Sequence, residues 1–164
     1  MAITVKPVTL WRRDVDNVPG VLAETLGPLA DAGVGLRVVM GYRLPDQPTH
    51  SVVEVWPVSG ARAIRAAQSA GLAASDVPCL LVEGDDRPGL GAEIGRACAE
   101  AGLNIAFCMA VAVGRRFTAA IGFTDAAAVD QAVRVLRTRL APARRKPARG
   151  ARSRRARPRG GQSR

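Results

Sequence analysis

Two short turns in this sequence combine residue types that bind small charged molecules. The first reads Asn17-Val18-Pro19-Gly20-Val21 and the second Asp86-Arg87-Pro88-Gly89-Leu90. Proline lacks an N–H and has a φ close to the helical value, so each turn predicts a helix that begins at its proline. The first turn of a helix leaves backbone N–H groups unpaired at the positive end of the dipole, and such groups suit a carboxylate.

The residue two positions before each proline is polar. Asn17 or Asp86 could receive an ammonium or hydroxyl group, and the glycine after each proline would let a ligand approach the backbone. The same side chains would serve equally well as helix caps. Ligand binding and capping are therefore both open for Asn17 and Asp86.

The two turns belong to an internal repeat. Pro88 lies 69 residues after Pro19, and at the same offset Ala101-Gly102-Leu103 matches Ala32-Gly33-Val34. A constant offset of this size indicates a duplicated structural unit. Units this small are marginal alone, so they should share an interface or pair with another chain. We predict two domains, residues 1–72 and 73–140.

The hydrophobic pattern predicts the order strand–helix–strand–strand–helix in each repeat. The elements of the first repeat are a strand from Val8 through Val15, a helix from Pro19 to Ala32, strands over 36–44 and 51–58, and a helix over 60–70. Those of the second cover 79–82, 88–101, 104–113, 117–123 and 125–140.

The fourth strand of a complete βαββαβ unit is missing from both repeats, unless residues 73–79 supply it to the first. No segment after residue 140 offers it to the second. The predicted fold class is α+β, with two ferredoxin-like units whose antiparallel sheets are covered by helices on one face. The other face and the sheet edges remain available to a neighbour.

The charge of the chain is concentrated at its C-terminal end. All 14 acidic residues precede residue 141, whereas residues 141–164 contain ten Lys or Arg and no acid. The charge of this segment therefore equals the formal net charge of the whole chain, +10. This segment has no apolar periodicity, so we predict that it is disordered. It could bind nucleic acid through phosphates, without sequence preference. The residues assigned to this role are Arg144, Arg145, Lys146, Arg149, Arg152, Arg154, Arg155, Arg157 and Arg159.

No set of residues predicts catalysis, a metal ion or a cofactor. The single histidine, His50, has no predicted nucleophile nearby and is interpreted as a surface residue. Cys79, Cys98 and Cys108 match no metal or redox spacing and are interpreted as small buried hydrophobic residues. The acidic residues near the turns are too sparse for a metal site, and Walker and dinucleotide motifs are absent.

The N-terminus does not have the layout of a signal peptide, and no apolar run is long enough to span a membrane. We therefore expect a cytoplasmic protein without a membrane partner.

The repeated Pro-Gly-hydrophobic turns, the Ala-Gly ends of the first helices and the Gly-Leu-Asn-Ile entry into the next strand resemble a tandem ACT-domain protein. The resemblance covers residues 8 to about 138. It implies a ferredoxin-like fold and a non-catalytic regulatory module that binds an amino acid at an interface between two ACT units. It also implies a homodimer or a regulated partner enzyme. The alternative is a nucleic-acid-associated regulator of the glycine-cleavage repressor type that uses the arginine tail.

The resemblance further implies how a ligand is held. In serine-binding ACT proteins an Asn before x-Pro-Gly of one unit and an Asn entering the second strand of its neighbour bind the ligand together. The position before x-Pro-Gly is Asn17 in repeat one and Asp86 in repeat two. The position that enters the second strand is Gly35 in repeat one and Asn104 in repeat two. We therefore predict one strong site per chain, which combines Asn17 with Asn104.

Overall fold

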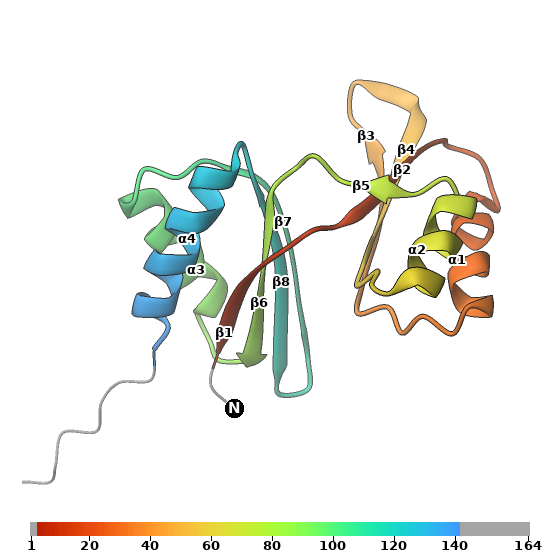
Figure 1. The fold of residues 1–164 in the computed structure, drawn as a ribbon. Coiled ribbons are helices and arrows are strands. Elements are labelled where there is room, and N and C mark those ends of the chain that lie inside the picture. The colour runs from red at the N-terminus through yellow and green to blue at the C-terminus, as the bar shows by residue number, and fades with distance from the viewer. Residues whose placement is uncertain (1–2, 142–164) are drawn as a thin grey trace, which may run out of the picture.

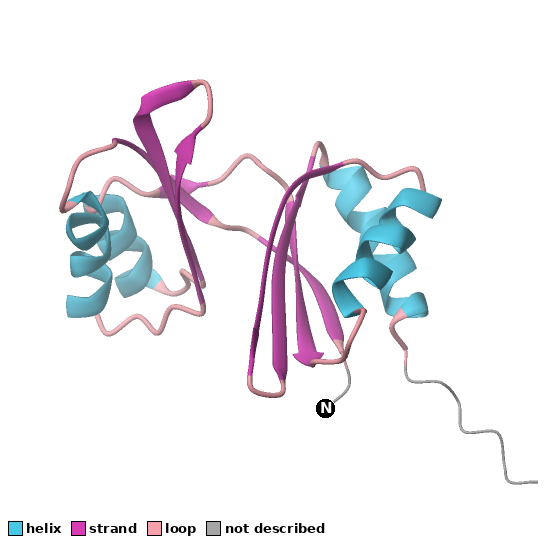
Figure 2. Ribbon diagram, turned by 180° about the vertical axis from the view of Figure 1, so that it is seen from behind, coloured by secondary structure: helices cyan, strands magenta, loops and turns pink. Residues whose placement is uncertain are grey.

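The computed structural model describes residues 3–141. It contains two four-stranded antiparallel sheets, each with two helices on one face (Figures 1 and 2). The sheets face each other across the middle of the molecule, and the helices lie on the outside. The predicted α+β fold with two ferredoxin-like units is confirmed, whereas the tail from residue 142 onward lies outside the described residues.

The first unit has the strand order β3-β4-β2-β5. Its elements are β2 (Trp11–Asp16), α1 (Val21–Asp31), β3 (Val38–Leu44), β4 (Gln47–Trp56), α2 (Ala61–Ser69) and β5 (Ala73–Ala74). β5 lies in the segment that the sequence suggested for a fourth strand, and it pairs with β2. Leu29, Val55 and Ala67 are fully buried between this sheet and its helices.

The second unit has the strand order β1-β6-β8-β7. Its elements are β6 (Cys79–Asp85), α3 (Leu90–Glu100), β7 (Ile105–Val113), β8 (Arg116–Phe123) and α4 (Ala126–Arg139), together with β1 (Thr4–Val8) from the start of the chain. Leu80, Ile121 and Leu136 are fully buried between this sheet and its helices.

The position of β1 corrects the sequence prediction of one strand from Val8 through Val15. Two strands are present, β1 and β2, separated by Thr9 and Leu10, and they belong to different sheets. β1 pairs with β6 and so fills the place of the fourth strand that residues after 140 do not provide. Val5, 4% exposed, faces the core beneath α4. The predicted ranges 1–72 and 73–140 therefore do not coincide with the two sheets.

Two helices begin later than their prolines predict. The residue before α1 is Gly20, with φ 95°, and the residue before α3 is Gly89, with φ 82°. These values lie in the left-handed region, which glycine adopts readily and a helix does not continue through. Pro19 and Pro88 therefore belong to the turns and not to the helices.

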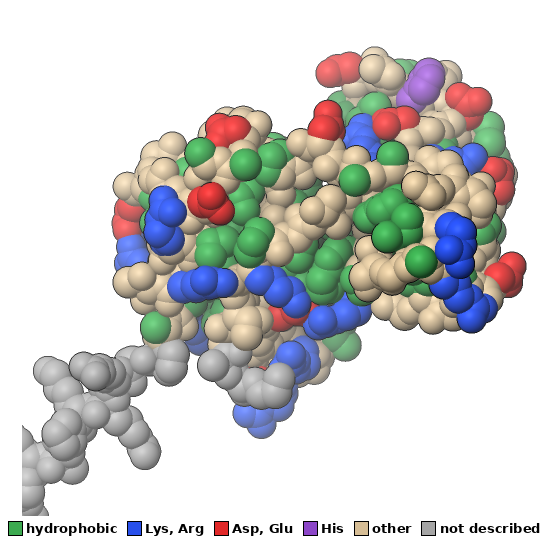
Figure 3. Space-filling view, viewed as in Figure 1, with side chains coloured by type: hydrophobic (Ala, Val, Ile, Leu, Met, Phe, Trp, Pro, Cys, Tyr) green, Lys and Arg blue, Asp and Glu red, His purple; other side chains and the backbone are tan. Residues whose placement is uncertain are grey.

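The sheet faces without helices pack partly against each other, and hydrophobic side chains gather between the two halves (Figure 3). Glu83 on β6, 8% exposed, forms ion pairs with Arg37 of the first unit and with Lys6 of β1. Lys6 and Arg37 lie over the ring of Trp56, at 4.7 and 5.4 Å from its centroid. The two units thus share the interface that their small size predicts.

A buried carboxylate also lies on the inward-facing side of the first sheet. Glu54 is fully buried and accepts hydrogen bonds from the hydroxyl groups of Tyr42, at 3.0 Å, and Ser75, at 3.4 Å. Burial, followed by the nearby Glu54 charge, raises the pKa of Tyr42 to about 12. Ser75 N also donates to Leu10 O at 2.8 Å. The two segments that connect the units, one at Leu10 and one at Ser75, therefore lie side by side.

Candidate ligand-binding site at the start of α1

The turn before α1 is held against β4 by two hydrogen bonds, one from the backbone and one from the side chain of Asn17. Asn17 N donates to Thr49 O at 2.8 Å, and the Asn17 side chain donates from Nδ2 to Pro48 O at 3.4 Å. α1 has no side-chain cap, and α3 has none either. The capping interpretation of Asn17 and Asp86 is therefore wrong.

A groove of about 240 Å³ opens beside this turn, between the start of α1 and the β3–β4 hairpin. Gly41 on β3 lines it, and a Cβ there would stand 4.0 Å from Cδ1 of Leu22, in van der Waals contact with it. Leu22 is 45% exposed and contributes, with Val21, an apolar wall. Apart from Tyr42, whose hydroxyl donates to Glu54, the polar residues that line the groove are Asn17, Arg43 and Ser51.

Arg43 is the cation of the groove. Its guanidinium has no hydrogen bond or ion pair with any of residues 3–141, and its side chain is exposed. The first N–H in α1 with a described acceptor is that of Glu24, which donates to Gly20 O at 3.0 Å. The groove therefore combines a free guanidinium with the unpaired N–H groups of a helix start, which together suit a carboxylate.

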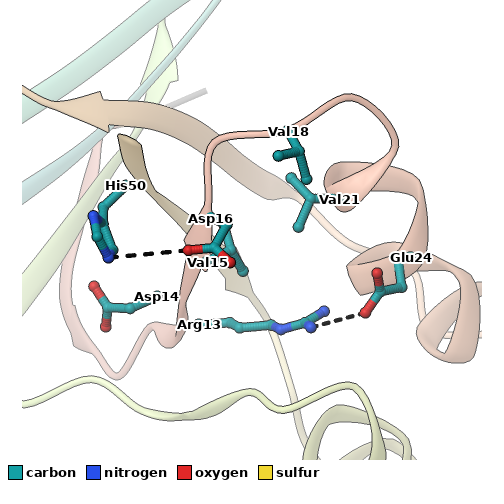
Figure 4. Close-up of a pocket in the computed structure, with 8 residues that line it drawn as sticks. All are labelled: Arg13, Asp14, Val15, Asp16, Val18, Val21, Glu24 and His50. Atoms are coloured by element: carbon teal, nitrogen blue, oxygen red, sulfur yellow. Dashed lines mark hydrogen bonds and ion pairs between the residues drawn. The ribbon is translucent and has the colours of Figure 1, made fainter. Parts of the chain in front are cut away.

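A wider hollow of about 460 Å³ lies on the other side of the turn (Figure 4). Its arginine and two of its three carboxylates already have partners. Arg13 donates to Glu24 at 2.8 Å and to Thr25 at 2.9 Å, and Asp14 accepts from Arg12 at 2.7 Å, which lowers the pKa of the Asp14 carboxyl. This hollow therefore lacks the free guanidinium that the groove at Arg43 offers to a carboxylate.

His50 also lines this hollow and is exposed, as predicted (Figure 4). Contrary to the sequence interpretation, a hydroxyl lies beside it, because Thr49 Oγ1 is 3.0 Å from His50 Nδ1. The Asp16 carboxylate stands 4.0 Å from His50 Nε2, which is beyond hydrogen-bonding distance.

The turn of the second unit is built differently. Arg87 forms an ion pair with Glu93, and Leu90 is 1% exposed and packs in the core. Two cross-strand partners, Ala112 and Phe117, occupy the positions that Arg43 and Ser51 hold in the first unit. Asp86 is exposed next to this turn and binds through its backbone N–H to Arg115 O, at 2.9 Å. The second unit therefore lacks the cation and the hydroxyl of the first.

The structure does not bring Asn17 and Asn104 together within one chain. Asn104 is exposed in the loop between α3 and β7, whereas every residue of the groove at Asn17 belongs to the first unit. Leu22, Gly41, Arg43 and Ser51 were missed by sequence reasoning. Gly41 and Arg43 interrupt the alternating apolar run from Leu36 to Leu44, and this was the one signal in the sequence that could have pointed to the groove.

The remaining candidate groups are potential metal ligands and the three cysteines. Residues 3–141 contain no group of three or more His, Cys, Asp or Glu that could hold a metal ion. Cys79 and Cys98 are buried as predicted, and burial raises the pKa of the Cys79 thiol to about 12. Cys108 is exposed, which corrects its interpretation as a buried residue, because it lies on an edge strand.

No helix between residues 3 and 141 is both long enough and apolar enough to cross a membrane.

This chain is similar to known proteins in its fold. No protein-family model matches the sequence, and no curated protein matches it significantly. A structure from Bacteroides thetaiotaomicron has a TM-score of 0.68 at 14% identity, over 84% of this chain and 91% of that one.

Two further similar structures come from aspartate kinases. The regulatory subunit from Thermus thermophilus has a TM-score of 0.55 at 16% identity, over 84% of this chain and 96% of that one. A structure of aspartokinase alpha and beta subunits has a TM-score of 0.55 at 22% identity, over 85% of this chain and 97% of that one. At these identities the likeness concerns the fold, which is a pair of ferredoxin-like units in one chain.

Proposed function

We propose that this chain is a non-catalytic regulatory module of the tandem ACT type that binds one amino acid in the groove at the start of α1. The observation that carries the proposal is the exposed Arg43 guanidinium, which has no partner among residues 3–141 and lies in a groove with Asn17 and Ser51. The ligand carboxylate would bind Arg43 and the first N–H groups of α1, and an apolar side chain would contact Leu22.

The fold and the groove both support a regulatory role. Regulatory subunits of aspartate kinase are among the structures similar in fold, and the sequence resembles tandem ACT proteins. The groove offers groups that bind and orient a small molecule, while the one His–Thr pair described above lacks an orienting carboxylate. The protein would then respond to an amino acid and act on a partner enzyme.

The test is a thermal-shift screen of the full chain against the twenty amino acids, because a ligand at 100 times its dissociation constant adds about 2.7 kcal/mol of stability. For the amino acid identified, Arg43→Gln and Asn17→Ala should each weaken binding by about 1.5 to 3 kcal/mol, the worth of a hydrogen bond to a charged group. Titration calorimetry should give one site per chain.

Arg65→Gln is the matched control, because Arg65 is also exposed and without a partner among the described residues but lies on α2, away from the groove. It should bind as the unchanged protein does. Asp86→Ala should have a smaller effect than Asn17→Ala. Asn104→Ala tests the predicted pairing, since it weakens binding only if Asn104 of a neighbouring chain reaches the ligand. Full affinity in Arg43→Gln, or two equal sites per chain, would contradict the proposal.

A second candidate function rests on the tail. Residues 141–164 contain ten Lys or Arg and no acid, which favours a nucleic-acid-associated regulator. Binding through phosphates should weaken by about a thousandfold or more between 50 and 200 mM salt if six or more phosphates are contacted.

Deleting residues 141–164 should abolish nucleic-acid binding and leave the melting temperature and amino-acid binding nearly unchanged. Fluorescence anisotropy with two duplexes of unrelated sequence checks both the affinity and the lack of sequence preference. Binding that survives the deletion would place the interaction in the folded part, and a deletion that unfolds the protein would show that the tail supports the fold.

A further inference from the structure

A cleft of about 270 Å³ lies between the two units, on the side of the sheets that carries no helices. Strand β3 of the first unit forms one wall, and strands β7 and β8 of the second unit form the other. Within the described chain, its lining consists of one cation, Arg37, one hydroxyl, Thr118, and six apolar side chains. None of these residues lines the groove at the start of α1, so the cleft is a separate site.

One end of the cleft is apolar. Met109 and Ala120 are partners across β7 and β8, and Met40 of β3 belongs to the same apolar cluster as Ala120. Met40 and Ala120 are each 2% exposed, whereas Met109 and Val111 are 44% and 54% exposed. The cleft therefore has a buried apolar floor and an apolar rim that is open to solvent. Methionine side chains are flexible, so this end can adapt to an apolar chain.

The other end of the cleft is polar. Val111 pairs with Thr118 across β7 and β8, and Thr118 pairs with Glu83 across β8 and β6, so the three residues form one row of the sheet. Arg37 forms an ion pair with Glu83, which places the guanidinium at this row. The Thr118 hydroxyl has no hydrogen-bond partner among residues 3–141. A cation and a free hydroxyl thus lie at the same end.

Arg37 has donors left for an anion. Glu83 also pairs with Lys6, whose Nζ stands 3.4 Å from the carboxylate, so two cations share one acid and the three charges sum to +1. Arg37 donates one described hydrogen bond, to Glu83, whereas a guanidinium has five N–H donors. The Arg37 side chain is 51% exposed. The cleft can therefore offer a charge-assisted hydrogen bond to a carboxylate without leaving Glu83 unpaired.

We propose that this cleft binds a small aliphatic carboxylate, a ligand class different from the amino acid of the groove at α1. The carboxylate would accept from Arg37 and from the Thr118 hydroxyl, and the chain would lie between Met40 and Met109. A volume of about 270 Å³ corresponds to roughly nine waters, so a chain of about eight carbons fills it. An amino acid fits poorly, because its ammonium would meet Arg37 and no acid lines the cleft. The ligand would contact both units and stabilise their interface.

The first test follows octanoate binding through the NMR signals of the methionine methyl groups in the full chain. The chain contains three methionines, of which Met40 and Met109 line the cleft and neither lines the groove at α1. Octanoate should shift the signals of Met40 and Met109 until they saturate. Affinity should rise about fourfold with each methylene from butanoate to octanoate. Octanol lacks the carboxylate and should bind at least ~10-fold more weakly than octanoate.

Two substitutions test the location and the charge. Val111→Glu places an acid in the cleft and should weaken octanoate binding at least ~10-fold. Val113→Glu is the matched control, because Val113 lies on the same strand, is 72% exposed and does not line the cleft, and it should bind octanoate as the unchanged protein does. Arg37→Gln leaves Glu83 its partner Lys6. It should abolish the preference for octanoate over octanol and leave the affinity for octanol unchanged, which a general loosening of the fold would not do.

Three results would overturn the proposal. They are methionine signals that octanoate does not shift, equal affinities for octanoate and octanol in the unchanged protein, and equal losses in Val111→Glu and Val113→Glu. Methionine shifts that follow the protein concentration and not octanoate would also overturn it, and would assign the cleft to a contact with a second copy. No measurement in this set depends on amino-acid binding at α1, so the two proposals stand or fall separately.

Discussion

Leu136→Ala is expected to lower the free energy of unfolding by about 2 to 5 kcal/mol. Leu136 is fully buried on α4, in the core formed by both helices of the second unit, β6, β8 and β1. Alanine would leave a cavity there, and the surrounding side chains come from elements too far apart in sequence to collapse into it freely. A loss of this size is a large part of the stability of a small domain.

Chemical denaturation followed by circular dichroism measures this loss. Arg134→Ala on the same helix is the control, because the Arg134 side chain is exposed and has no partner among the described residues, and the denaturation midpoint should hardly move. An unchanged midpoint in Leu136→Ala would mean that α4 does not pack on the sheet through this face.

Gly122→Ala is expected to cost about 1 to 3 kcal/mol, because it overpacks the face between the two units. A Cβ at Gly122 on β8 would stand 2.2 Å from Cε1 and 2.4 Å from Cδ1 of the Phe107 ring. The ring cannot swing away freely, since it packs against the apolar cluster that the two units share. Phe107 thus occupies the space that a side chain at position 122 would need.

A double-mutant cycle separates this clash from a general effect of alanine in a strand. Phe107→Leu should make Gly122→Ala less costly, so the two changes together should destabilise the protein by less than their sum. Gly91→Ala on α3 is the control, because nothing lies within 4 Å of a Cβ added there. Alanine in a helix should be neutral or stabilising. Additive effects of Phe107→Leu and Gly122→Ala would show that the ring does not cause the loss.

The sequence predicted the elements of the fold well where the signals were local. The spacing of Val129, Ala132, Val133 and Leu136 identified the buried face of α4, and Asp125 caps that helix by accepting from Ala128 N at 2.8 Å. Pairing between distant strands has no such local signal. The predicted strand from Val8 through Val15 therefore missed β1, because nothing in the local pattern shows that Thr9 and Leu10 separate strands of two different sheets.

The candidate site was predicted in part for the same reason. The turn from Asn17 to Val21 carries its own chemistry in its residue types, so it could be recognised directly. Arg43 and Ser51 contribute only because the β3–β4 hairpin is folded beside that turn. The predicted partnership of Asn17 with Asn104 depends on how chains assemble, and residues of one chain do not reveal it.

The path of the chain between its two units has a mechanical consequence. The chain begins in the second unit as β1, crosses to build the first, and returns to complete the second, so two covalent connections join the halves. They run side by side and are joined where Ser75 N donates to Leu10 O. A single linker lets two bodies swivel, whereas a paired one resists torsion. Any strain that a ligand or partner imposes on one half would therefore be transmitted to the other as a rotation or a bend, and would not be lost in a flexible joint.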